Sequence, residues 1–145
     1  MSKIAIINRR AKFEYAFLEM YEAGIQLMGK EVKSLRNGNA SIADAYCAFE
    51  DDELFLINAH IAEYKFGNIN NHEPLRKRKL LLKKKELRKL QNKLKDKGLT
   101  IIPIEMLQNE RGYVKLQIAL AKGKKAFDKR EDIKKRDIQR EMDRY

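Results

Sequence analysis

An alternation of apolar and polar side chains near the C-terminal end constrains the fold of this chain most. Residues 113–121 ("YVKLQIALA") place four apolar side chains on one side of an extended segment: Val114, Leu116, Ile118 and Leu120. The polar residues between them lie on the other side, and a period of two is typical of a β-strand with one buried face. Residues 100–107 ("TIIPIEML") precede this run across the loop "QNERG". The sequence therefore predicts an antiparallel hairpin.

Earlier segments also favour strands. Residues 43–50 alternate in the same way, and the turn "DDE" leads into residues 54–57 ("LFLI"), which predicts a second hairpin. The period of residues 12–27 fits either a helix or a strand. We favour extended structure there because aromatic residues are frequent and Gly24 interrupts the run. Many short strands predict a small, mostly antiparallel barrel or sheet with helical covers.

Two helices are expected. Val32 and Leu35 form one short helical stripe, and the Asn-Gly pair that follows is a stop signal. A longer helix is predicted over residues 80–97, which end before Gly98. Its apolar stripe consists of Leu80, Leu87, Leu90 and Leu94. Lys and Arg make up most of the remaining positions, so the helix is expected to bury one face and expose a cationic one.

The positive charge of the chain is concentrated in two segments. The 145 residues have a formal net charge of +11, yet residues 1–75 carry a net −3. Residues 76–97 hold 12 Lys and Arg against 2 Asp and Glu, and residues 122–130 carry a net +4. Clustered cations on a folded scaffold indicate a polyanionic partner such as nucleic acid. A membrane-surface helix is the rival interpretation, although the apolar stripe lacks Trp and Phe.

The apolar pattern ends after Ala121, which divides the chain in two. We expect residues 1–121 to form one folded domain and residues 122–145 to form a basic C-terminal tail. The tail has too few apolar residues to bury a core of its own, and short isolated helices are marginal in water. We therefore expect the tail to be disordered in isolation and helical when it is docked on a partner.

No constellation of residues typical of an enzyme or a metal site is found. Cys47 lies on the apolar side of a predicted strand, and His60 and His72 have no Cys partners at ligand spacing. Phosphate-binding loop motifs are also absent, so we expect no catalysis, no metal and no cofactor. One cysteine and the lack of a long apolar run favour a soluble, cytoplasmic protein.

Four phrases occur together in the chain: "NRRAKFEY" (residues 8–15), "EAGIQLMGKEVKSLRNGNASIADAY" (22–46), "RKLLL" (78–82) and "IALAKGKKAFDKREDIKKRD" (118–137). In this order they resemble the SsrA-binding protein (SmpB) family over almost the whole chain. The resemblance implies a mostly β fold, an oligonucleotide-binding (OB) type antiparallel barrel flanked by two or three helices.

The resemblance also implies a function. Members of the family bind transfer-messenger RNA (tmRNA, or SsrA RNA) at its tRNA-like domain. They deliver alanine-charged tmRNA to stalled ribosomes, where the tail enters the empty mRNA channel at the decoding centre and contacts 16S ribosomal RNA. Peptide tagging and ribosome rescue follow. The implied partners are tmRNA, the ribosome and elongation factor Tu, and the protein is expected to be a monomer that performs no chemistry itself.

The family phrases assign roles to particular residues. The implied tmRNA-binding residues are Asn8, Arg9, Arg10, Glu22, Glu31, Lys33, Ser34, Arg36, Lys79, Leu81 and Lys83. The implied ribosome-binding tail residues are Lys122, Gly123, Lys124, Lys125, Phe127, Asp128, Lys129, Arg130, Lys134, Lys135 and Arg136.

This chain departs from the family pattern at three positions. Some members carry Asn where this chain has Lys83, which keeps a donor and adds charge but lacks the acceptor of Asn. His or Tyr is common where this chain has Phe127, whose ring still offers a face for base stacking. Ile138 replaces the Trp of some members and keeps an apolar anchor.

Two other interpretations remain open on sequence grounds. A generic ribosomal or RNA-binding accessory protein with an OB-type barrel would share the charge pattern and the strands. A structural module that binds membranes or other polyanions would share the basic helix.

Overall fold

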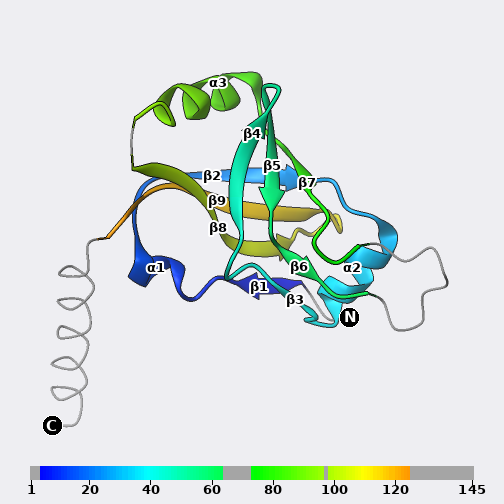
Figure 1. The fold of residues 1–145 in the computed structure, drawn as a ribbon. Coiled ribbons are helices and arrows are strands. Elements are labelled where there is room, and N and C mark those ends of the chain that lie inside the picture. Colours follow the sequence, from blue (N-terminus) through cyan, green and yellow to red (C-terminus); the bar gives the residue numbers. More distant parts are fainter. Residues whose placement is uncertain (1–3, 64–72, 97, 125–145) are drawn as a thin grey trace, which may run out of the picture.

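The computed structural model of the protein describes residues 4–63, 73–96 and 98–124 (Figure 1). In chain order, these residues form β1 (Ala5–Ile7), α1 (Ala11–Glu14), β2 (Tyr15–Ile25), α2 (Gly29–Arg36), β3 (Ala40–Ser41), β4 (Tyr46–Glu50), β5 (Glu53–Ile57), β6 (His60–Ile61), β7 (Arg78–Leu81), α3 (Lys84–Lys93), β8 (Leu99–Gln108) and β9 (Val114–Gly123). Nearly all of the expected tail, residues 125–145, lies outside the described residues, as do residues 64–72.

Six strands form a closed circuit. The order in the main sheet is β1-β8-β4-β5-β7-β2-β9, and β9 also pairs with β8, so the pairing returns to β8. All of these pairs are antiparallel. The seventh strand of this sheet, β1, lies outside the circuit and pairs with β8 through Ala5–Ile7, and β3 pairs separately with β6. The predicted mostly β, OB-like fold with helical covers is confirmed.

The interior of the barrel is filled by the inward side of each strand. The predicted apolar side of β9 is buried: Val114, Leu116, Ile118 and Leu120 all belong to the main core. Burying a side chain of this size contributes about 1.5–3 kcal/mol. The long β8–β9 hairpin was therefore predicted correctly from its alternation, because one continuous face meets the core.

A β-bulge in β2 sends its side chains to two different cores. The register with β9 shifts between Phe17 and Glu19. Beyond the shift, Ala23 and Ile25 point into the barrel, whereas Phe17 packs on the outside with a second cluster. That cluster consists of Ala11, Ile102, Ile104, Ala119 and Ala121. The helix α1 thus covers part of the outer wall, and residues 15–25 are extended as predicted.

The other predicted turns and the short helix are confirmed. Asp51 and Asp52 join β4 to β5 with φ angles of 49° and 65°, the left-handed values of a two-residue hairpin turn. The strand β4 begins at Tyr46 rather than at residue 43. The helix α2 ends at Arg36, Asn37 is its C-cap, and Gly38 follows with a φ of +73°.

The long helix was predicted over residues 80–97, and both bounds were wrong, because α3 begins at Lys84 and ends at Lys93. Leu80 belongs to β7, which pairs with β2 and β5, and α3 begins at Lys84. Leu80 is buried, but it lies in a strand. Its spacing from Leu87 matched a helical leucine stripe only by coincidence. The backbone amide of Lys83 donates to Glu86 Oε1 at 3.2 Å, which fixes the true N-terminus of the helix. Leu87, Leu90 and Leu94 do pack on the barrel core as expected.

Candidate nucleic-acid interface

Four neighbouring strands present one row of side chains on the outer wall of the barrel. Glu22 of β2 pairs with Gln117 of β9, Gln117 pairs with Glu105 of β8, and Glu105 pairs with Ile7 of β1. On β2 and β9 the neighbours of these residues along the strand, Ala23, Leu116 and Ile118, point into the core, so the row itself faces outward. Only Glu22 of this row was predicted from the sequence.

A second row runs beside the first. Leu81 of β7 pairs with Gly24 of β2, Gly24 with Lys115 of β9, and Lys115 with Leu107 of β8. Leu81 is 47% exposed and Leu107 is 44% exposed. Ile7 and Met20 are also exposed, so apolar side chains are accessible beside the carboxylate, amide and ammonium groups of the two rows. Such a mixture suits ribose and base contacts in addition to phosphate contacts. We call these two rows the outer sheet face.

Asn8 holds the start of α1 against β8. Its backbone amide donates to the carbonyl oxygen of Ile104 at 2.8 Å, and its Nδ2 donates to that of Pro103 at 3.0 Å. Asn8 is therefore 7% exposed, while Arg9 and Arg10 follow as exposed residues. Asn8 and Arg9 line a groove of about 870 Å³ that also contacts Glu105 and Gln117. The predicted residues Asn8, Arg9 and Arg10 thus lie beside the first row.

The predicted residues of α2 divide into exposed and internal ones. Lys33 and Arg36 are exposed, whereas Glu31 and Ser34 are buried. Ser34 Oγ donates to the carbonyl oxygen of Ala62 at 2.7 Å. A buried side chain that is bonded inside the protein cannot contact a partner directly. Glu31 and Ser34 therefore hold α2 in place, and the tmRNA contact that the resemblance implies for α2 stays a prediction.

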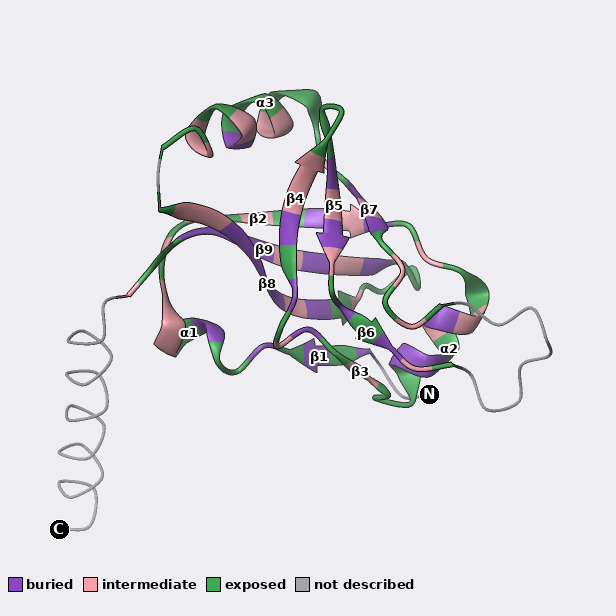
Figure 2. Ribbon diagram, in the orientation of Figure 1, coloured by how far each residue is buried: buried purple, intermediate pink, exposed green. Residues whose placement is uncertain are grey.

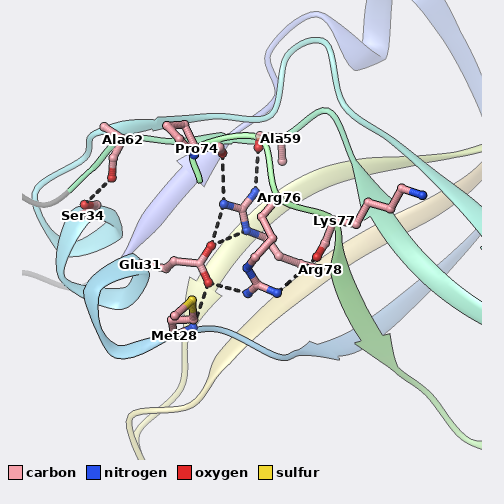
Figure 3. A network of polar contacts seen from close by, with 9 residues as sticks. All are labelled: Met28, Glu31, Ser34, Ala59, Ala62, Pro74, Arg76, Lys77 and Arg78. Carbon is pink, nitrogen blue, oxygen red and sulfur yellow. Dashed lines mark hydrogen bonds and ion pairs between the residues drawn. The ribbon is translucent and has the colours of Figure 1, made fainter. Parts of the chain in front are cut away.

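Glu31 is the centre of an ion network that ties α2 to β7 (Figure 3). Its Oε1 accepts from Arg76 Nη2 at 2.6 Å and from the Met28 amide at 2.8 Å, and its Oε2 accepts from Arg78 Nε at 2.7 Å. Arg78 is itself fully buried and also donates to the carbonyl oxygens of Ala59 and Pro74. Burial acts to raise the pKa of Glu31, but the bonds from Arg76, Met28 and Arg78 outweigh it and lower the pKa.

The remaining predicted residues of the barrel lie near β7. Lys79 Nζ forms an ion pair with Glu53 at 3.0 Å, and Lys83 is exposed at the N-cap of α3. Leu81 between them is part of the outer sheet face. Of the resemblance-based set, Glu22 and Leu81 lie in adjacent rows of the outer sheet face, next to Gly24, which was not in the set.

The first residues of the predicted tail are still part of the folded domain. Lys122 and Gly123 belong to β9 and pair with Ala16 and Tyr15. The Lys124 amide donates to the carbonyl oxygen of Glu14 at 2.9 Å, and its Nζ donates to that of Lys12 at 3.0 Å. The tail therefore leaves the barrel beside α1. The other predicted tail residues lie outside the described part of the chain: Lys125, Phe127, Asp128, Lys129, Arg130, Lys134, Lys135 and Arg136.

Within residues 4–63, 73–96 and 98–124, no group of three His, Cys, Asp or Glu residues is placed to hold a metal ion. Cys47 is buried, and its burial raises the pKa of the thiol, which keeps it protonated and unreactive. Across the same ranges, no helix combines the length and the apolar character needed to span a bilayer.

Comparisons with known proteins agree with one another. The sequence model described as "SmpB protein" matches residues 5–145. The "SsrA-binding protein" of Flavobacterium psychrophilum is 54% identical over 99% of this chain and 96% of its own length. That of Phocaeicola vulgatus is 55% identical over 97% and 94%, and that of Thermosipho africanus 52% identical over 99% and 96%.

A solved structure is also similar. It is described as "tmRNA-SmpB: a journey to the center of the bacterial ribosome". One of its chains is 50% identical, with a TM-score of 0.73, over 90% of this chain and 94% of that one.

Proposed function

The chain belongs to the SmpB protein family, and we propose that its outer sheet face holds the tRNA-like domain of tmRNA. tmRNA binding in trans-translation is the function that the SsrA-binding relatives and the similar ribosome-related structure support. The observation that carries the proposal for this face is the pairing of Leu81, Gly24 and Glu22 with positions of β9 and β8 in two adjacent exposed rows.

The physical basis of recognition is the shape of the RNA. Base-paired RNA shows a shallow groove lined with hydroxyl groups and phosphates, and proteins read it mostly through those groups. Arg9 and Arg10 supply cations at one end of the outer sheet face, and Lys115 supplies another within it. Glu22 and Glu105 supply acceptors for ribose hydroxyls or base amino groups. Exposed Leu81 and Leu107 supply the apolar surface.

The tail forms the second half of the proposal. Residues 125–145 carry further cations and Phe127, and they would enter the mRNA channel only when no message occupies it. The folded domain stays bound to tmRNA while the tail occupies the channel. On this division of labour the protein binds rather than catalyses, acts in the cytoplasm as a monomer, and meets the ribosome alongside elongation factor Tu.

Identification of the RNA that co-purifies with the full chain from bacterial cells tests the proposal. We expect tmRNA to be enriched at least tenfold over bulk ribosomal RNA, since specific RNA contacts exceed non-specific phosphate binding by at least about 1.4 kcal/mol. Enrichment of ribosomal RNA alone would instead favour the generic RNA-binding accessory protein. A loss of all RNA together with binding to anionic vesicles would favour the membrane-binding module.

A further inference from the structure

The turn between β4 and β5 places negative charge beside the most basic part of the chain. We call its four consecutive carboxylates the acidic tip: Glu50, Asp51, Asp52 and Glu53. Residues 76–97, in contrast, hold 12 Lys and Arg against 2 Asp and Glu. Figure 2 shows that the turn is exposed and lies next to α3. Gln91 Nε2 of α3 donates to Asp52 Oδ1 at 2.9 Å, so the two segments are in contact.

Both ends of the acidic tip form ion pairs with lysines of the β7 segment. Lys77 Nζ donates to Glu50 Oε1 at 2.6 Å, and Lys79 Nζ donates to Glu53 Oε1 at 3.0 Å. Lys79 lies opposite Phe55 of β5, and Glu53 is two residues before Phe55. Glu53 is therefore the diagonal neighbour of Lys79 across the strand pair. The register of β5 and β7 thus brings this carboxylate and this ammonium group together.

The paired lysines lie at the border of the outer sheet face. Arg78 and Leu80 are buried, whereas Lys77, Lys79 and Leu81 alternate with them and point outward. Figure 3 shows Lys77 turned away from the buried ion network. Leu81 belongs to the second row of the outer sheet face. The two ion pairs therefore stand directly beside the surface that is proposed to hold RNA.

The charges of the acidic tip are unfavourable for the hairpin itself. Glu50 is paired directly with Glu53, and like charges in that position repel each other. Asp51 and Asp52 add two carboxylates at left-handed backbone positions, which Asn and Gly also adopt without a charge. Closure of the hairpin therefore does not require four carboxylates, and their effect on neighbouring cations is the better explanation.

An RNA phosphate that approaches this border meets a competitor. It must displace a carboxylate from Lys77 or Lys79, and the remaining carboxylates of the acidic tip repel it. An RNA that binds only through its phosphates depends on every accessible cation. An RNA that fits the outer sheet face also gains ribose and apolar contacts. Withdrawal of two cations therefore weakens the first kind of RNA more than the second.

We propose that the acidic tip keeps Lys77 and Lys79 paired and thereby makes the protein select tmRNA against other RNA. This inference rests on the proposed function, because it names the residues that set the selectivity of the outer sheet face. The acidic tip acts by repelling the wrong partner and not by attracting the right one. Lys79 then stays paired with Glu53 in the tmRNA complex. The tmRNA contact that the resemblance implies for Lys79 is the alternative that the test decides.

The test compares two double variants of the full chain. Glu50→Gln with Glu53→Gln, the tip variant, releases both lysines. Asp44→Asn with Glu63→Gln is the matched control, because it removes two exposed carboxylates outside the hairpin and changes the net charge equally. Dissociation constants are measured over a salt series for the isolated tRNA-like domain of tmRNA and for an RNA duplex of equal length. Thermal midpoints check that both variants fold, since exposed ion pairs contribute little to stability.

We expect the tip variant to bind the duplex about tenfold more tightly than the unmodified chain does. The slope of log affinity against log salt should become steeper by about 1.5, because two more cations contact phosphates. The affinity of the tip variant for the tRNA-like domain, and both affinities of the control, should change by less than about threefold. Adding Lys77→Gln and Lys79→Gln to the tip variant should return the duplex affinity to that of the unmodified chain.

Three results would overturn the inference. An equal gain for both RNAs would show that the freed lysines also contact tmRNA. A duplex affinity equal to that of the control would show that the ion pairs do not withhold Lys77 and Lys79 from phosphates. A gain that persists after Lys77→Gln and Lys79→Gln would show that the acidic tip acts through net charge alone.

The two proposals fail in different ways. If the unmodified chain does not prefer the tRNA-like domain over the duplex, the proposed function is wrong. If the unmodified chain has this preference and the tip variant behaves like the control, only the role of the acidic tip is wrong.

Discussion

Gly24 of β2 lies opposite Leu81 of β7, and a Cβ atom placed on Gly24 would lie 3.3 Å from the Cβ of Leu81. This distance is shorter than ordinary contact, and the atom concerned is fixed to the backbone of β7. The absence of a side chain at position 24 thus allows β7 to sit close to β2, with Leu81 exposed above it. The most contiguous part of the outer sheet face depends on this approach.

Gly24→Ala should therefore displace Leu81 and weaken binding to the tRNA-like domain. We expect about a fivefold loss of affinity, together with about 1 kcal/mol of destabilisation from overpacking. Gel-shift titration and urea unfolding measure the two effects. Gly29→Ala is the matched control, because a Cβ on Gly29 meets nothing within 4 Å. Equal affinities of the two variants would show that Leu81 is not part of the RNA contact.

Gln117→Ala tests whether the site extends to residues that the family phrases did not indicate. Gln117 joins Glu22 to Glu105 in the first row, and its amide both donates and accepts. Loss of its contacts should lower the affinity for the tRNA-like domain about threefold to tenfold, since one hydrogen bond is worth about 0.5–1.5 kcal/mol. Gln91→Ala, on α3, should leave this affinity unchanged. Identical affinities for the two variants would limit the site to the β2–β7 edge.

Glu31→Gln should destabilise the fold by about 3 kcal/mol at pH 7, because it leaves the buried Arg78 without its counter-charge. Urea unfolding measures this loss. Glu50→Gln, which breaks the exposed pair with Lys77, should cost at most about 1 kcal/mol. A comparably small loss for Glu31→Gln would mean that the network does not hold α2 in place.

The same carboxylate should make stability depend on pH. The pKa of Glu31 is lower in the folded protein than its ordinary value of 4.5. Its stabilisation is therefore complete above about pH 4.5 and is lost as the pH falls through the lowered folded value. Lowering the pH from 5 to 3 should reduce the free energy of unfolding of the unmodified protein more than that of Glu31→Gln. Parallel pH profiles of the two proteins would contradict this assignment.

The parts of the molecule that were predictable are those decided by local periodicity. The β8–β9 hairpin follows from alternation, and α2 follows from its Asn-Gly stop, because each signal lies within about ten residues. Leu80 was misassigned because a buried strand residue also fits the spacing of a leucine stripe. The bulge at Leu18 has no sequence signal of its own, although it decides which core receives Phe17.

The site was less predictable than the fold. Family phrases identified Glu22 and Leu81, but the pairing that brings Gln117, Glu105 and Leu107 beside them depends on strand register. The contact between Glu31 and Arg78 joins residues that are 47 positions apart. Nothing local shows that this Glu is buried. Contacts between residues so far apart in sequence cannot be predicted from local patterns and are known only from the folded structure.

Phe127→Ala should affect the ribosomal step rather than the tmRNA step. Stacking of a base on an aromatic ring is worth about 1–3 kcal/mol, so tagging on stalled ribosomes should fall about tenfold or more. Binding to the tRNA-like domain should stay within about twofold. Phe127→Tyr, which keeps the ring face, should restore tagging. Equal losses in binding and tagging for Phe127→Ala would indicate that this ring belongs to the tmRNA site.

Two truncations separate the tail from the barrel that anchors it. Ending the chain after Lys124 keeps the pairing of Lys122 and Gly123 with β2 and the bond from the Lys124 amide to Glu14. This form should bind the tRNA-like domain within about twofold of the full chain and should support no tagging. Ending after Ala121 removes those bonds as well, each worth about 1 kcal/mol, so the domain should also lose stability. A loss of most of the tmRNA affinity in the form that ends after Lys124 would show that the tail and the barrel do not act as separate surfaces. Arg9 and Arg10, beside α1, would then be insufficient to hold the RNA.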